Sequence, residues 1–191
     1  MKQQWVFAFE DGDGKNKMLL GGKGANLCEM TQIGLNVPPG FTITTDACLA
    51  YLEHDELPKG AWEEILKNMK DLETKTGKQF GGADNPLLIS VRSGSSMSMP
   101  GMMDTILNLG LNKTTLQGLI KLTDNPRFGY DAYRRFIQLY GKIALGVEDK
   151  HFDDAMAAMK KKVGVSQDVD LKAEHLSELA DQFARIIEAN T

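Results

Sequence analysis

Short apolar or β-branched runs, separated by turns rich in glycine and proline, characterise the first 112 residues of the chain. Runs of this length and composition are typical of strands. We therefore predict strands at residues 5–9, 41–44, 87–91 and 105–109. The third strand is expected to be buried, and the fourth is expected to be its hairpin partner.

Helices are predicted between these strands. The glycine-rich turn at residues 21–24 leads into a short helix, which Gly34 is placed to end. The residues of this helix expected to face inward are Leu27, Met30 and Ile33. Thr44 or Thr45 is predicted to cap a second helix, because a hydroxyl there accepts hydrogen bonds from free backbone N–H groups. A third helix is expected after Gly60, with apolar residues at helical spacing.

From Asn112 onward the apolar positions recur at helical spacing throughout. We predict four helices, which begin near residues 114, 126, 152 and 172. Pro126 suits the first turn of the second of these, and Gly164 should end the third. The last helix has no stop signal before Thr191, so we expect the chain to be a piece of a longer protein.

These patterns predict a mixed α+β or α/β fold with two parts. Residues 1–111 are expected to form an α/β subdomain, and residues 112–191 a helical subdomain that is truncated. The apolar fraction of 42% and the charged fraction of 25% are those of an ordinary globular protein.

Charge and composition exclude several classes of function. The chain has 22 basic and 26 acidic side chains, a net charge of −4, which argues against a nucleic-acid-binding platform. The N-terminus has no apolar signal-peptide core, and no apolar run approaches the roughly 20 residues of a membrane span. The two cysteines and three histidines show no metal-ligand spacing, so no metal site is expected within the chain. We therefore expect a cytoplasmic protein without membrane or nucleic-acid partners.

The turn Gly21-Gly22-Lys23-Gly24 is a candidate anion site. Glycines allow close approach of the backbone, the start of the following helix presents free N–H groups, and Lys23 adds a positive charge. The segment differs from the nucleotide-binding P-loop pattern. Glycine-rich turns before helices are common, so this turn alone is weak evidence for a site.

A second candidate follows the third predicted strand, in the segment Val91-Arg92-Ser93-Gly94-Ser95-Ser96. A planar guanidinium is the preferred bidentate partner of phosphate oxygens, and hydroxyls and turn amides can complete a phosphate cradle. The alternative is an exposed arginine at a strand end, followed by a solvated loop. Arg92 and Lys23 in one small α/β subdomain, each beside a glycine turn, favour phosphate binding.

Several segments resemble the N-terminal nucleotide-binding domain of the PEP-utilising dikinases. They are LLGGKGANL at residues 19–27, PGFTIT at 39–44 and VRSG at 91–94. The run SMPGMMDTILNLG at residues 98–110 narrows the resemblance to the pyruvate, phosphate dikinases, and NPRF and YRRF at 125–128 and 133–136 agree with it. The related PEP synthases share the first and third of these segments but differ after the strand.

This resemblance implies an ATP-grasp-like domain whose ATP phosphorylates a histidine on a separate domain. The overall reaction of the family converts ATP, pyruvate and phosphate reversibly into AMP, PEP and diphosphate, and a third domain binds pyruvate or PEP. The resemblance also implies a requirement for Mg²⁺, whose ligands are expected outside this chain, and a full-length homodimer. This chain alone is expected to be inactive. A PEP synthase-like dikinase and a stand-alone, non-catalytic nucleotide-binding module are the alternatives.

The resemblance also suggests roles for particular residues. Lys23 and Arg92 match the family's phosphate-contacting lysine and arginine, and they are the candidate catalytic residues. The remaining candidate nucleotide-binding residues are Ser93, Gly94, Met103, Asp104, Thr105 and Arg135. For Arg135 the alternative is an ion pair on a helical face.

Overall fold

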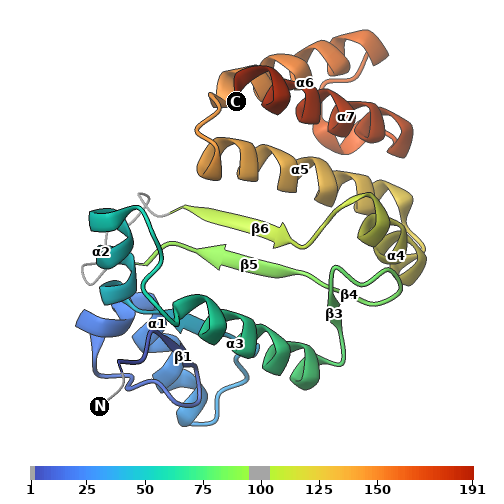
Figure 1. The fold of residues 1–191 in the computed structure, drawn as a ribbon. Helices are drawn as coiled ribbons and strands as arrows, with labels where there is room; N and C mark the ends of the chain where they lie inside the picture. The colour runs from blue at the N-terminus through green and yellow to red at the C-terminus, as the bar shows by residue number, and fades with distance from the viewer. Residues whose placement is uncertain (1–2, 95–103) are drawn as a thin grey trace. The chain divides into compact units, whose positions relative to one another are not determined.

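The computed structural model describes residues 3–94 and 104–191 (Figure 1). By their contacts these residues divide into two compact units. The first is made of residues 3–77 with Ser93 and Gly94, and the second of Lys78–Arg92 and Asp104–Thr191. Met103, one of the candidate site residues, lies outside the described residues.

The first unit combines two short strands with three helices. They are β1 (Val6–Ala8), α1 (Lys17–Gln32), β2 (Phe41–Ile43), α2 (Thr45–His54) and α3 (Ala61–Thr76). β1 and β2 pair antiparallel, with Val6 opposite Ile43 and Ala8 opposite Phe41. The buried Thr44 side chain accepts a hydrogen bond from the N–H of Ala47, which confirms the predicted cap of α2.

The core of this unit includes the buried Leu20, Ala25 and Cys28, against which Phe7 and Phe9 pack. The sequence prediction for α1 was therefore wrong in part. Met30 and Ile33, expected to face inward, are 39% and 69% exposed. The helix restarts after a kink at Gly21 and ends at Gln32, so Ile33 lies past its last residue and Cys28 takes the inward position.

The second unit contains four strands, four α-helices and one 3-10 helix among its described residues. Its strands are β3 (Gln79–Phe80), β4 (Pro86–Leu87), β5 (Ile89–Arg92) and β6 (Thr105–Leu109). Its helices are α4 (Lys113–Thr123), α5 (Pro126–Ala144), α6 (Asp149–Val163), the 3-10 helix η1 (Asp168–Asp170) and α7 (Ala173–Asn190).

The predicted hairpin is confirmed, since β5 and β6 pair antiparallel. β5 is not buried as predicted, because its residues Ser90 to Arg92 are exposed. The buried Leu87 belongs instead to β4, which forms a short parallel pair with β3 that the sequence pattern did not predict.

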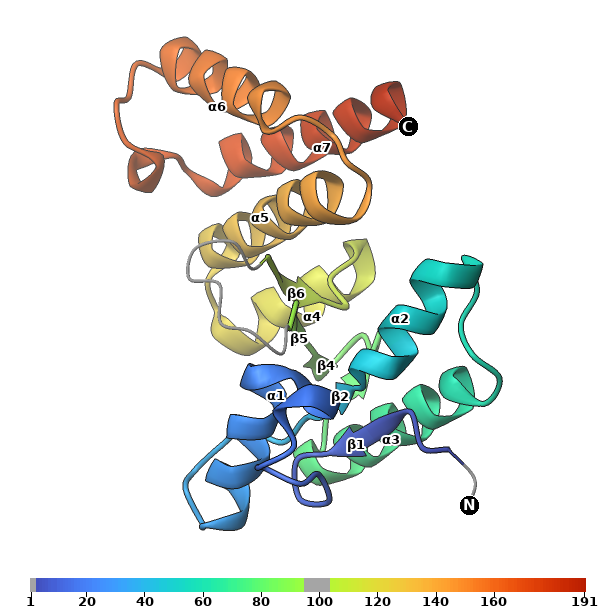
Figure 2. The same cartoon turned by 90° about the vertical axis from the view of Figure 1, so that its left-hand side faces the viewer.

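Helices α5, α6 and α7 form the largest core of the second unit. α5 lies between the β5–β6 pair on one side and α6 and α7 on the other (Figure 2). Phe152 and Phe183 are fully buried and meet edge to face at 5.0 Å between ring centroids. A Cβ on Gly141 of α5 would lie 2.9 Å from side-chain atoms of both Phe152 and Ile187, so a glycine there permits the close packing of α5 on its neighbours.

The expected mixture of helices and small sheets is confirmed and is compatible with an α+β fold. The contacts group the β5–β6 pair with the helices that follow it, whereas the subdomain boundary at residue 111 remains a prediction. Within residues 3–94 and 104–191, no helix combines the length and the hydrophobicity that a bilayer crossing requires.

Candidate functional site

Gly21 interrupts α1 two residues before Lys23. Its backbone angles, φ 68° and ψ 163°, are not helical, so residues 17–20 form one short turn and a second helix starts at Gly22. The first N–H groups of a helix have no carbonyl partner within that helix, and they form a favourable site for an anion. The exposed Lys23 therefore lies in the first turn of a helix, as an anion site requires.

Two contacts within the first unit hold this kink. The hydroxyl of Thr45 donates to the carbonyl oxygens of Met18 and Leu19, at 2.5 and 3.2 Å, where the short turn before Gly21 ends. A Cβ on Gly24 would lie 2.7 Å from the side chain of Thr42, so the glycine allows α1 to lie directly on β2. Sequence reasoning identified Thr45 only as a possible helix cap and missed this second role.

The Lys23 side chain is directed to the other predicted segment. Its Nζ donates to the backbone carbonyl of Ser93 at 3.4 Å, and both residues belong to the first unit. A bond of this length to a neutral carbonyl is weak compared with a charge-assisted bond to an anionic oxygen.

Arg92 and Thr105, both predicted as site residues, are direct cross-strand partners on β5 and β6. Arg92 is the last residue of its strand and is exposed, and Asp104 directly precedes β6. Ser93 and Gly94 are also exposed, and among the described residues nothing lies within 4 Å of a Cβ built on Gly94.

Arg135 lies on α5, and its Nε donates to Oδ2 of Asp131 one turn earlier, at 3.0 Å. The ion pair on a helical face, which the sequence left open as the alternative, is therefore present. Such a pair does not by itself exclude contact with a nucleotide, because a guanidinium has five N–H donors.

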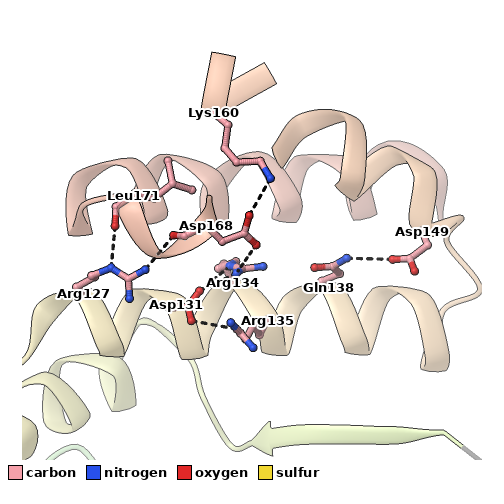
Figure 3. Close-up of polar contacts among 9 residues, drawn as sticks. All are labelled: Arg127, Asp131, Arg134, Arg135, Gln138, Asp149, Lys160, Asp168 and Leu171. Carbon is pink, nitrogen blue, oxygen red and sulfur yellow. Dashed lines mark hydrogen bonds and ion pairs between the residues drawn. The ribbon is translucent and has the colours of Figure 1, made fainter. Parts of the chain in front are cut away.

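The neighbouring Arg134, which sequence reasoning passed over, is buried in a polar network (Figure 3). It donates to Asp131 and reaches the carboxylate of Asp168, to which Lys160 donates at 2.9 Å. The bond from Lys160 holds the pKa of the Asp168 carboxyl below its usual value, against the opposing effect of burial. The side chain of Arg127 donates to the backbone carbonyls of Leu171 and Asp168, so the network fastens the segment around η1 to α5.

Arg134 could have been found from the helical period. It lies three residues before the buried Ile137 and seven before the buried Gly141, on the inward face of α5. Arg135 is one position, or about 100°, further around the helix and is exposed.

Within residues 3–94 and 104–191, no three His, Cys, Asp or Glu side chains are grouped so that they could hold a metal ion.

Part of the first unit resembles a known domain. Residues 17–76, which span α1 to α3, match the family model "Pyruvate phosphate dikinase, AMP/ATP-binding domain". The Gly21 kink and Lys23 lie within the matched residues.

Curated relatives extend the likeness to nearly the whole chain. The chain is 57% identical over 98% of its length to the pyruvate, phosphate dikinase of Entamoeba histolytica, and 48% identical over 96% to that of Clostridium symbiosum. It is also 46% identical over 95% to the chloroplastic enzyme of Mesembryanthemum crystallinum. These matches support an N-terminal fragment of a pyruvate, phosphate dikinase, as the sequence resemblance predicted. The chain covers 21%, 21% and 20% of these relatives, or about a fifth of their length.

Proposed function

We propose that this chain binds ATP as the N-terminal part of a pyruvate, phosphate dikinase. The full-length enzyme would convert ATP, pyruvate and phosphate reversibly into AMP, PEP and diphosphate, through a phosphorylated histidine on another of its domains. The observation that carries the proposal is 57% identity over 98% of this chain to a relative of that name. The phosphohistidine and PEP/pyruvate domains would belong to the part of the relatives that this chain does not cover. Cytoplasmic location, homodimeric assembly and an ATP-grasp-like fold are parts of the same proposal.

Lys23 is proposed to bind ATP phosphate oxygens. Its position in the first turn after the Gly21 kink supports this role, because helix N–H groups and a lysine charge act on the same anion there. On binding, the ammonium group would exchange its 3.4 Å contact with the Ser93 carbonyl for a stronger bond to a charged oxygen.

Arg92 is proposed to bind the same triphosphate through its planar guanidinium. Its exposure at the end of β5 and its cross-strand neighbour Thr105, whose hydroxyl can donate to a phosphate, support this role. Ser93, Gly94, Met103 and Asp104 are proposed to complete the nucleotide-binding segment. Arg135 is proposed to contribute a further positive charge.

Phosphoryl transfer depends mainly on positioning and on neutralisation of the charge that develops on the phosphate oxygens. In this proposal Lys23 and Arg92 supply both effects, and the ligands of Mg²⁺ belong outside this chain. Removing one charge-assisted hydrogen bond should cost roughly 1.5–3 kcal/mol of binding to the reacting phosphate. This loss corresponds to about a ten- to hundredfold slower reaction.

The test uses Lys23→Ala, Arg92→Ala and Arg92→Lys in the full-length enzyme, with its two half-reactions measured separately. Each alanine variant should slow the ATP half-reaction by about ten- to hundredfold. The exchange between pyruvate and PEP should remain near the wild-type rate. Arg92→Lys should restore activity only in part, because lysine lacks the planar pair of donors.

Two results would contradict the proposal. An equal loss in both half-reactions would mean that Lys23 and Arg92 are structural. Formation of AMP and PEP without any requirement for inorganic phosphate would instead assign the chain to a PEP synthase-like enzyme.

A further inference from the structure

The carboxylate of Asp131 on α5 is shared between two consecutive arginines. Its Oδ1 accepts the Nε–H of Arg134 at 2.9 Å and lies 2.8 Å from Nη2 of the same guanidinium in an ion pair. Its Oδ2 accepts the Nε–H of Arg135 at 3.0 Å. In Figure 3 the two guanidinium groups lie on different sides of Asp131, Arg134 toward η1 and Arg135 toward β6.

One side of this arrangement is fixed in the protein interior. The side chain of Arg134 is only 6% exposed, and beyond Asp131 it reaches Oδ2 of Asp168 at 3.5 Å. Lys160 donates to the other oxygen of Asp168. Asp131 itself is 17% exposed, so its carboxylate is held by a buried partner and has little freedom to rotate.

The other side is open to a ligand. The Arg135 side chain is 56% exposed, and it contacts Asp131 through Nε. Among the described residues, the structure gives no polar partner to its two terminal nitrogens. These two nitrogens form the end of the guanidinium, which can bind two oxygens of one phosphate.

An ordinary exposed ion pair one helical turn apart contributes little to stability, because both flexible side chains must be ordered to form it. Here one partner is already immobilised by Arg134. The entropic cost of ordering therefore falls on Arg135 alone, and the pair can hold this arginine in place before a ligand arrives.

We propose that Asp131 is a positioning residue, which holds Arg135 so that its terminal nitrogens are free to bind a phosphate oxyanion of the nucleotide. Arg134 does not contact the nucleotide and serves to fix Asp131. The inference rests on the proposed function, in which Arg135 contributes to ATP binding.

Asp131→Asn separates the two contacts. An asparagine can turn its amide oxygen toward Arg134 and keep that acceptor, but its NH₂ group cannot accept the Nε–H of Arg135. Glu178→Gln is the matched control, because Lys162 donates to Glu178 at 2.8 Å in an exposed ion pair between α6 and α7. Four variants are made in the full-length enzyme. They are Asp131→Asn, Glu178→Gln, Arg135→Ala and the Asp131→Asn/Arg135→Ala double variant. ATP affinity, the rate of the ATP half-reaction and the thermal unfolding midpoint are measured for each.

Asp131→Asn should weaken ATP binding and slow the ATP half-reaction by about two- to tenfold, the cost of ordering one flexible side chain. It should have no effect in the Arg135→Ala background, and Glu178→Gln should leave both quantities unchanged.

An equal effect of Asp131→Asn in both backgrounds would overturn the inference, since Asp131 would then act independently of Arg135. Wild-type ATP binding by Arg135→Ala would also overturn it. The Lys23 and Arg92 variants would still test the proposed function in that case, so the two failures are distinguishable.

Discussion

The kink at Gly21 makes a sharp prediction for the substitution Gly21→Ala. A φ of 68° with a ψ of 163° lies in a region that is essentially restricted to glycine, because a Cβ there clashes with the backbone. Alanine is a better helix former than glycine, so helix propensity alone would predict stabilisation. The two arguments therefore give effects of opposite sign.

The backbone strain should win at this position. Forcing an alanine into such a conformation costs roughly 1–3 kcal/mol, whereas the gain from helix propensity is at most about 1 kcal/mol and applies only to helical angles. We expect Gly21→Ala to lower the free energy of unfolding by about 1–3 kcal/mol. The adjacent Gly22 has no positive φ and lies within the second helix, so Gly22→Ala should be neutral or stabilise by up to about 1 kcal/mol.

Urea denaturation followed by tryptophan fluorescence suits this comparison. The chain has two tryptophans, Trp5 and Trp62, and both lie in the first unit with the kink. Their fluorescence therefore reports the unfolding of that unit. A Gly21→Ala variant as stable as wild type, or a Gly22→Ala variant destabilised to the same extent, would show that the kink is not a required feature of the fold.

Two further predictions concern polar contacts. Thr45→Val removes the hydroxyl that donates to the carbonyls of Met18 and Leu19 and should lower the free energy of unfolding by about 1 kcal/mol. Thr45→Ser should retain most of it, and equal losses in the same fluorescence assay would refute the contact. Because Lys160 lowers the folded-state pKa of Asp168, wild type should exceed Asp168→Asn in stability at neutral pH. This difference in stability should disappear as the pH falls below about 4, through the lowered pKa, because Asp168 is then protonated. Urea unfolding followed by circular dichroism at several pH values measures it. A difference that persists in acid would contradict the prediction.

Helix ends were the features most accurately predicted from the sequence. Thr44 caps α2, Pro126 begins α5, and Gly34 and Gly164 lie at the ends of α1 and α6 as expected. Each of these signals is local, since a cap or a positive φ is decided by the residue and its immediate backbone. Such signals are readable without knowledge of the tertiary structure.

Burial was predicted less well. The run at residues 87–91 is apolar enough for a buried strand, but Ser90 and Val91 are exposed in this chain. The parallel pairing of β3 and β4 uses strands of two residues each, which are too short to produce a periodic pattern. Whether an apolar side chain is covered depends on what packs against it, and a single sequence window does not contain that information.

The residues of the candidate site also differ in whether local sequence signals or only the tertiary packing reveals them. Lys23 and Arg92 could be proposed from the sequence because a glycine turn before a helix and a guanidinium beside a glycine turn are local features that suit a phosphate. Asp131 could not, because the role proposed for it depends on Arg134, which is buried and reaches Asp168, in a segment 34 residues further along the chain than Arg134. Arg134 and Arg135 are chemically identical neighbours, and one step around the helix places one in the core and leaves the other exposed. A family motif could therefore suggest Arg135 as a ligand contact, whereas the positioning role proposed for Asp131 follows only from the packing of the folded chain.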